Sequence, residues 1–147
     1  MQISIIEPGT KDQLRDYYDL RWRVLRQPHG QPRGSEKDDL EEMSIHLMAY
    51  YGPKMPAAAG RAHFNSPDEA QIRFMAVDPC CRNSGIGSSL LAALEKRVKI
   101  SGARYIILNS RESAVGFYEK NGYIKVAEAG TLFGNIRHVR MKKDLAG

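Results

Sequence analysis

Residues 82–87 read Arg82-Asn83-Ser84-Gly85-Ile86-Gly87 and lie between a β-rich segment and an amphipathic one. The apolar spacing that follows predicts a helix over 85–100, ended by Gly102. A helix start offers unpaired backbone N–H groups and the positive end of the helix dipole. Glycine lets an anion approach that backbone closely. Together with the charge of Arg82, these features suggest a pyrophosphate cradle. The alternative is a glycine-rich turn that only opens a helix.

Two other phosphate-binding loops do not fit this segment. A dinucleotide-binding fingerprint has a third glycine where this chain has Leu90, and an acidic residue where the next strand ends in Asn109 and Ser110. A P-loop has a lysine after its last glycine, and none follows Gly87. The pattern that fits is Arg-x-x-Gly-x-Gly after a strand that ends at Val77.

The flanking sequence predicts alternating strands and helices. The expected strands are 3–6, 46–51, 57–64, 71–77, 104–108, 123–126 and 136–141. The expected helices are 11–26, a short acidic one at 35–43, 85–100 and 113–120. In the first of these, apolar side chains share one face and the arginines, Arg21 included, lie mainly elsewhere. This mixture indicates an α/β or α+β sheet protein.

Two motifs carry a resemblance to a known family. The Arg-x-x-Gly-x-Gly loop resembles the acyl-CoA-binding motif of the Gcn5-related N-acetyltransferase (GNAT) superfamily. Residues 113–123 are similar to its A-x-x-F-Y-x-x-x-G-[FY] segment, and 136–141 to its last strand. The resemblance covers residues 71–141. It implies one GNAT-like acyltransferase domain over 1–147, with a mixed, mostly antiparallel central sheet, flanking helices, and splayed fourth and fifth strands.

The first half narrows the resemblance. Residues 17–28, 31–36 and 72–77 look like the N-terminal acyltransferase half of a bacterial bifunctional acyltransferase–thioesterase protein. The printed chain contains no thioesterase half. Two functions follow as hypotheses. The first is an acyl-CoA-dependent N-acetyltransferase that moves an acetyl group from acetyl-CoA to an amine by direct transfer. The second is a non-catalytic acyl-CoA sensor, or a partner of a separate thioesterase.

The resemblance also implies the residues of the site. Backbone groups of Met75, Ala76 and Val77 would bind the pantetheine arm, with the Val77 amide on the thioester carbonyl. Asn109 would face the same cleft or cap the turn after its strand. Tyr118 would protonate the leaving CoA thiolate as a general acid, or else pack as an aromatic residue. The pyrophosphate would be held by Arg82, Asn83, Ser84, Gly85, Ile86 and Gly87.

The general base stays open. Alternation over residues 71–76 puts Gln71, Arg73 and Met75 on one face, with Ile72, Phe74 and Ala76 on the other. None of these is a carboxylate, which keeps the sensor hypothesis in play. Either a water chain serves as the base or a side chain from another element does, and the conceivable residues are Glu36, Asp38, Asp39, His46 and His138.

The acceptor pocket is expected among the first helix, its loop and the last strands. Arg73 and the loop arginines suggest an acceptor that carries a carboxylate or phosphate. Arg111 would reach a CoA phosphate or cap a solvated surface. The expected pocket residues are Tyr17, Trp22, Arg26, His29 and Arg33.

Composition sets the outer limits. The chain has 147 residues, of which 42% are hydrophobic and 27% charged, as in one globular domain. We expect no membrane span and no secretion signal. Adjacent Cys80 and Cys81 are typical of neither an ordinary disulfide nor a closed zinc site, so we expect no metal and a cytoplasmic protein. The net charge of +5 suits an acidic partner such as acyl carrier protein. We expect no nucleic acid, and a homodimer is conceivable.

Overall fold

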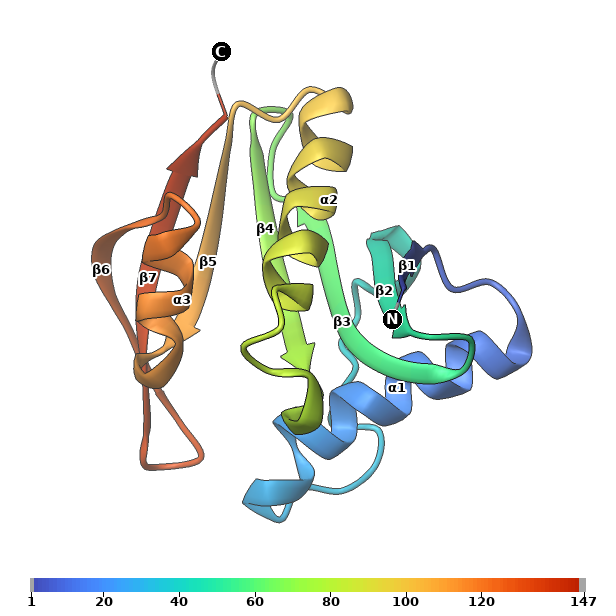
Figure 1. The fold of residues 1–147 in the computed structure, drawn as a ribbon. Coiled ribbons are helices and arrows are strands. Elements are labelled where there is room, and N and C mark those ends of the chain that lie inside the picture. The colour runs from blue at the N-terminus through green and yellow to red at the C-terminus, as the bar shows by residue number, and fades with distance from the viewer. Residues whose placement is uncertain (1, 146–147) are drawn as a thin grey trace.

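The computed structural model describes residues 2–145, which build one seven-stranded sheet in the order β1-β2-β3-β4-β5-β7-β6 (Figure 1). Strands β4 and β5 pair in parallel, and the other neighbours pair antiparallel. The expected mixed, mostly antiparallel sheet is therefore confirmed, with β5 and β6 longer than predicted. The strands are β1 (Ile3–Ile6), β2 (Ile45–Tyr51), β3 (Met55–Phe64), β4 (Glu69–Val77), β5 (Tyr105–Arg111), β6 (Ile124–Leu132) and β7 (Ile136–Asp144).

Three α-helices flank the sheet: α1 (Lys11–Leu25), α2 (Ile86–Ile100) and α3 (Val115–Lys120). None of the helices between residues 2 and 145 is long and apolar enough to cross a membrane. Short 3-10 turns lie at Gln27–His29, Glu41–Met43, Pro79–Cys81 and Glu112–Ala114.

The prediction of an acidic helix at 35–43 is wrong, because only the last three residues of this range form a 3-10 turn. The Glu41 carboxylate accepts the N–H of Asp38, and the Asp38 carboxylate accepts the N–H of Leu40. Acidic side chains thus take backbone donors that a helix would need.

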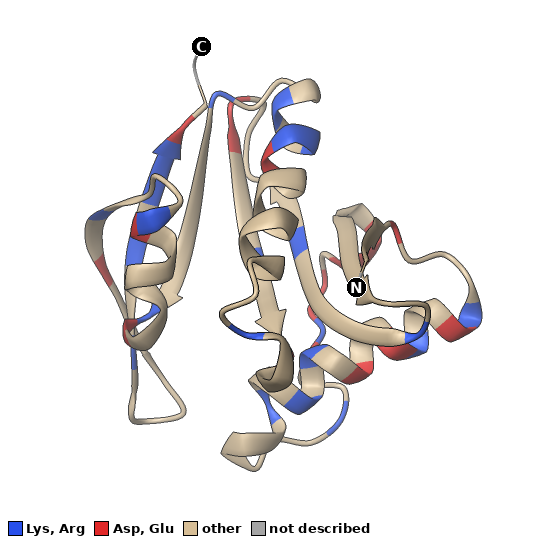
Figure 2. Ribbon diagram, viewed as in Figure 1, with Lys and Arg blue, Asp and Glu red and all other residues tan. Residues whose placement is uncertain are grey.

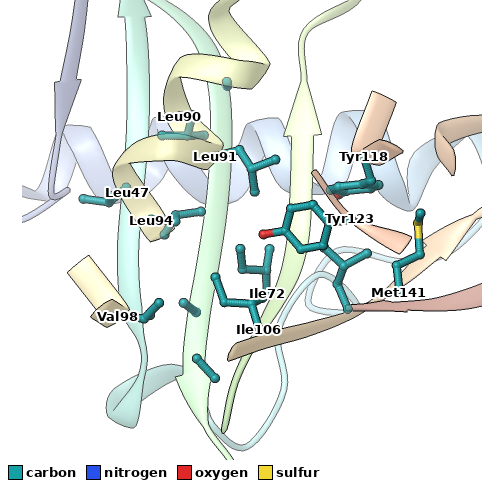
Figure 3. Close-up of a cluster of buried hydrophobic side chains, with 14 of the residues drawn as sticks. Leu47, Ile72, Leu90, Leu91, Leu94, Val98, Ile106, Tyr118, Tyr123 and Met141 are labelled. Atoms are coloured by element: carbon teal, nitrogen blue, oxygen red, sulfur yellow. The ribbon is translucent and has the colours of Figure 1, made fainter. Parts of the chain in front are cut away.

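The two faces of the sheet carry separate hydrophobic clusters. Helix α2 and part of α3 pack on one face, where Leu90, Leu91 and Leu94 meet Ile72 and Ile106 (Figure 3). Helix α1 packs on the opposite face of β3 and β4 through a smaller cluster. The members of that cluster are Tyr17, Leu20, Met48 and Ala59. The middle of the sheet is therefore covered on both sides.

Strands β4 and β5 part half-way along. Their pairing runs from Glu69↔Tyr105 to Ile72↔Leu108 and goes no further. On its other edge, β4 carries an irregularity between the Arg61↔Arg73 and Ala59↔Ala76 pairs, where Phe74 and Met75 face the single residue Gly60. Such a bulge bends the strand that carries the extra residue. Figure 1 shows the two strands separating toward the end where α2 begins, which confirms the expected splay.

The bulge also overturns the expected alternation of side chains over residues 71–76. Phe74 has a φ of 55° and joins Arg73 on the α1 face, where its ring lies 4.1 Å from the guanidinium carbon of Arg21. Met75 instead lies on the α2 face. A Cβ on Gly60 would lie 2.9 Å from the Met75 sulfur. The glycine thus makes room for Met75.

Candidate active site

The loop before α2 exposes backbone donors. Gly85 caps the helix with a φ of 84°, and nothing within 4 Å would meet a Cβ there. The Ser89 N–H makes a helical bond to the Gly85 carbonyl at 3.0 Å. The N–H groups of residues 86–88 therefore precede the first helical bond and lack an acceptor in the helix. This arrangement is suited to an anion.

The six loop residues do not all face outward. Arg82, Asn83, Ser84 and Gly85 are exposed, whereas Ile86 and Gly87 are buried. The Ser84 hydroxyl donates to the Cys81 carbonyl. A Cβ on Gly87 would lie 3.1 Å from Val77 Cγ2 and 3.2 Å from Phe117 Cε1. Gly87 therefore serves the close packing of α2 on β4 and α3, a role that the sequence pattern did not indicate.

The backbone of β4 presents alternate residues to the open side. The Asp78 N–H donates to the Ala57 carbonyl at 2.8 Å, and Val77 stands opposite Ala58. In an antiparallel pair, neighbouring residues direct their polar groups to opposite edges. Ala76 therefore turns toward β3, and Val77 turns its N–H toward the gap. The expectation that Ala76 shares in pantetheine binding through its N–H and carbonyl does not fit this direction.

Tyr118 is buried with its ring edge-on to Tyr123, at 5.7 Å between centroids (Figure 3). Burial raises the pKa of Tyr118 above its ordinary value, and the nearby charge of Arg111 opposes this only partly. The phenol is consequently protonated at neutral pH and able to donate. Asn109 is exposed, and its Oδ1 accepts from Arg140 Nε at 3.2 Å.

The candidate bases differ in how far they are engaged. Asp38 binds Arg61 and Arg73, whose hydrogen bonds and charges outweigh burial and lower its pKa. Both ring nitrogens of His46 are engaged, by Tyr17 and the Glu41 carbonyl.

The other candidate bases are less engaged. Glu36 is buried and accepts the Gly34 N–H at 2.7 Å, and Asp39 is exposed. His138 Nδ1 lies 3.0 Å from the Ile136 carbonyl, which can only accept. In its neutral form, Nδ1 therefore carries the proton and Nε2 keeps a lone pair.

The expected acceptor-pocket residues differ in how deeply they are buried. Tyr17 is fully buried, and its hydroxyl lies 3.2 Å from the Gly60 carbonyl oxygen, behind the bulge. Trp22 donates to the Gln31 carbonyl and carries the Arg33 guanidinium 4.0 Å above its ring. His29 stacks on Phe133, in the turn between β6 and β7, at 5.4 Å. The first loop and the last hairpin thus meet.

One group of residues between 2 and 145 has the composition of a metal site. Ligand atoms of Asp78, Cys80 and Cys81 lie within 4.8 Å of one another. The Cys80 thiol donates to Asp78 Oδ1 at 2.9 Å, and this bond raises the pKa of Cys80 to about 11. Asp78 Oδ2 also binds Arg23 at 3.2 Å. The three ligand atoms are one fewer than a closed zinc site uses.

Comparison with known proteins identifies the family. Residues 34–145 match the acetyltransferase (GNAT) domain family. The chain belongs to that family. It is 34% identical over 135 residues to YjcF of Bacillus subtilis, described as an uncharacterized N-acetyltransferase, and the match covers 92% of this chain and 95% of YjcF. GNAT acetyltransferases take the acetyl group from acetyl-CoA, so this chain is an acetyl-CoA-dependent N-acetyltransferase.

Solved structures share the fold of this acetyltransferase. Ard1 from Thermoplasma volcanium superposes with a TM-score of 0.83 at 19% identity, over the whole of both chains. An aminoglycoside 6'-N-acetyltransferase in complex with coenzyme A superposes with a TM-score of 0.81 at 20% identity, over 100% of this chain and 98% of that one.

A buried arginine network lies on the α1 face of this acetyltransferase, and the sequence analysis missed it. Arg21 and Arg61 are both 0% exposed. Glu41 binds Arg21 at 2.9 Å and Arg61 at 2.7 Å. The expectation that Arg21 lies off the buried face is therefore wrong. The available signals were Arg61 inside an alanine-rich strand and the Tyr17–Arg21 spacing of one helical turn.

We predict that Glu41→Gln lowers the free energy of unfolding at pH 7 by about 3 kcal/mol, because it leaves two buried guanidinium groups under-compensated. Arginine hydrogen bonds and charges outweigh burial and lower the pKa of Glu41 below its ordinary 4.5. The Glu41 carboxylate therefore stabilises the fold fully above pH 4.5, and this stabilisation is lost as the pH falls below 4.5 and through the lowered pKa. Urea denaturation from pH 7 to pH 3 should show wild type and variant converging. Exposed Glu42→Gln is the control, and an equal loss in both variants would contradict the network's role.

Proposed function

We propose that this acetyltransferase transfers the acetyl group directly to a primary amine held beside acetyl-CoA. The observation that carries the proposal is the parting of β4 and β5 beside the start of α2. Val77, Gly87 and Phe117 meet there, which brings the open edge of β4, the donors of α2 and helix α3 together. The cysteines do not favour a covalent intermediate, since Cys81 is buried and the pKa of Cys80 is raised by its bond to Asp78.

The proposed roles follow the chemistry of aminolysis. The N–H groups at the start of α2, with Arg82 and Asn83, hold the pyrophosphate. The Val77 N–H donates to the thioester carbonyl and stabilises the oxyanion as the amine attacks. The carbon–sulfur bond then breaks, and Tyr118 gives its proton to the departing thiolate. The aminoglycoside acetyltransferase that shares this fold was solved with coenzyme A, which supports a CoA site in this chain.

The attacking amine must also lose a proton, and we propose His138 as its acceptor, directly or through a water molecule. His138 pairs across the strands with Arg111 on β5, so it lies at the divided end of the sheet. Its bond to the Ile136 carbonyl leaves Nε2 free for a proton. Asp38 and His46 lack such a free acceptor, because arginines or hydrogen bonds already occupy them.

Other expectations remain predictions. These are a single domain over 1–147, a cytoplasmic location, a homodimer, and acyl carrier protein as a partner. The thioesterase resemblance finds no support in the curated relatives. The matches cover 91–95% of the lengths of three Bacillus subtilis proteins, among them YjcF, which leaves little room in them for a second half. An acyl-CoA sensor would bind acetyl-CoA without acetylating any amine, so turnover separates it from the enzyme.

The phosphate cradle is tested by Gly85→Asp against Gly85→Asn. Aspartate and asparagine have nearly the same shape, and both tolerate positive φ better than other side chains. An aspartate at this position adds a negative charge and competes for the N–H groups. We expect the aspartate variant to bind acetyl-CoA at least about tenfold more weakly than the asparagine variant by calorimetry. Equal affinities would place the pyrophosphate elsewhere.

Tyr118→Phe should reduce kcat by about 10²-fold or more, as expected for loss of a general acid, with the Kd of acetyl-CoA unchanged. Phenylalanine keeps the ring contact with Tyr123 and removes only the hydroxyl. Tyr105→Phe is the control, because its hydroxyl binds Glu69 at the paired end of β4 and β5. Unchanged kcat in Tyr118→Phe would assign this residue to packing alone.

His138→Gln should lower kcat by about 10²-fold as well, again with acetyl-CoA binding retained. Glutamine can still donate to the Ile136 carbonyl but cannot take up a proton. Added imidazole should partly restore turnover in His138→Ala, since it supplies the missing base. Full activity in His138→Gln would exclude this residue and turn attention to Glu36, whose Glu36→Gln variant completes the comparison.

A further inference from the structure

Two guanidinium groups converge on one carbonyl at the end of α1. Arg26 Nη1 donates to the Leu25 carbonyl oxygen at 3.3 Å, and Arg111 Nη2 donates to the same oxygen at 3.1 Å. Arg26 follows α1 directly, whereas Arg111 ends β5. The two residues are 85 positions apart in sequence (111 minus 26), so the fold brings these charges together.

Neither arginine has an acidic partner in direct contact. Among the ion pairs of residues 2–145, none includes Arg26, which is buried, or Arg111, which is half-buried. The Nε of Arg26 donates a hydrogen bond to the Ser35 carbonyl oxygen at 2.9 Å. Glu36 is the acidic group close enough to favour the charged form of Arg26. Backbone carbonyls hold these two cations in place without neutralising them.

Further cations surround the pair. Burial is the first cause that lowers the pKa of Arg26, followed by the charges of Arg73, Arg111 and Arg21. Burial and the charge of Arg82 lower the pKa of Arg111. Like charges held this close repel one another, and an anion bound among them would relieve the repulsion. Figure 2 shows basic positions on the loop after α1, at the end of β5 and before α2.

The pair lies at the divided end of the sheet. Arg111 lies in the part of β5 that has left β4, and Arg73 is the first β4 residue beyond the last pair with β5. The Arg26 guanidinium lies 5.4 Å from the rings of both Phe74, at the bulge, and Phe133, in the last hairpin. Two aromatic rings therefore lie beside Arg26.

We propose that Arg26 and Arg111 bind a carboxylate of the amine acceptor, so that the acceptor class is amino acids or other amines with a carboxylate. This inference rests on the proposed function and names the substrate class of that site. Guanidinium groups match the planar, two-oxygen geometry of a carboxylate. A phosphate of CoA also binds guanidinium groups, and the charge of Arg82, in the phosphate loop, contributes to lowering the pKa of Arg111. That loop already provides N–H donors for phosphate, so the arginine pair remains available to bind the carboxylate of the acceptor.

The test compares the twenty L-amino acids with their α-amides, each pair differing mainly in the carboxylate charge. CoA release gives kcat/KM for each acceptor, corrected for the fraction of free amine. We expect wild type to favour the acid of its best pair by about tenfold or more. In Arg26→Gln and Arg111→Gln, that preference should fall toward one. Arg26→Lys and Arg111→Lys should keep part of it, because the charge remains while the fork geometry is lost.

Arg104→Gln is the matched control, because Arg104 is 79% exposed and precedes the paired end of β5. It should keep the wild-type preference. Equal use of acids and amides by wild type would overturn the proposal. So would a Kd for acetyl-CoA that rises in Arg111→Gln while the acid preference stays, since the pair would then serve CoA. Thermal melts of every variant check that it is folded.

A binding measurement separates this inference from the proposed function. Calorimetry titrates N-acetyl amino acids and their amides into the protein, with and without CoA. Tighter binding of the acids, lost in both arginine-to-glutamine variants, is the expected result. If wild type binds acetyl-CoA and shows no preference between acids and amides, the carboxylate site is wrong and the acetyltransferase chemistry stands. If acetyl-CoA itself does not bind, the proposed function fails, and the titration without CoA still decides the carboxylate site.

Discussion

The bulge in β4 is the constraint on which the site depends. Two residues, Phe74 and Met75, stand where the partner strand supplies only Gly60, so β4 bends and its pairing with β5 ends at Ile72. A non-glycine residue in the left-handed region costs about 1–2 kcal/mol. Packing must offset this conformational cost. Phe74 is held on the α1 face among the guanidinium groups of Arg21, Arg61 and Arg73. Met75 fills the space above Gly60 on the other face.

The buried arginines therefore have a structural reason to be present. Arg21 and Arg61 are both fully removed from solvent, and each has an Nε without a partner. Their attraction to Glu41 offsets part of the desolvation, and the face of Phe74 supplies more. A hydrophobic core would stabilise this region equally well. Through their contacts with Phe74, the two arginines hold the bulged backbone in place.

Sequence reasoning reached the fold because its decisive signals are local. The glycine loop, the apolar stripe of α2 and the 113–123 segment each act within one element, and the resemblance supplied the splay. The bulge could not be predicted, because residues 71–77 alternate acceptably as a regular strand until Gly60 is placed opposite them. For the same reason, the sequence pattern predicts phosphate access for Gly87, although its neighbours Val77 and Phe117 come from other elements. Arg26 and Arg111 meet only in the folded chain.

In the proposed mechanism, the arrangement of charge assigns the two substrates to different donors. On the α2 side, uncharged N–H groups and a helix dipole face the gap, which suits a phosphate that must approach backbone closely. On the α1 side, guanidinium groups of Arg26 after α1, Arg73 on β4 and Arg111 on β5 lie near the divided end of the sheet, and guanidinium groups suit planar anions. Under the two proposals above, acetyl-CoA and a carboxylate-bearing amine would approach from different faces and meet at the bulge. The thioester and the amine would then be brought together without competing for one set of donors, which is what the proposed direct transfer requires.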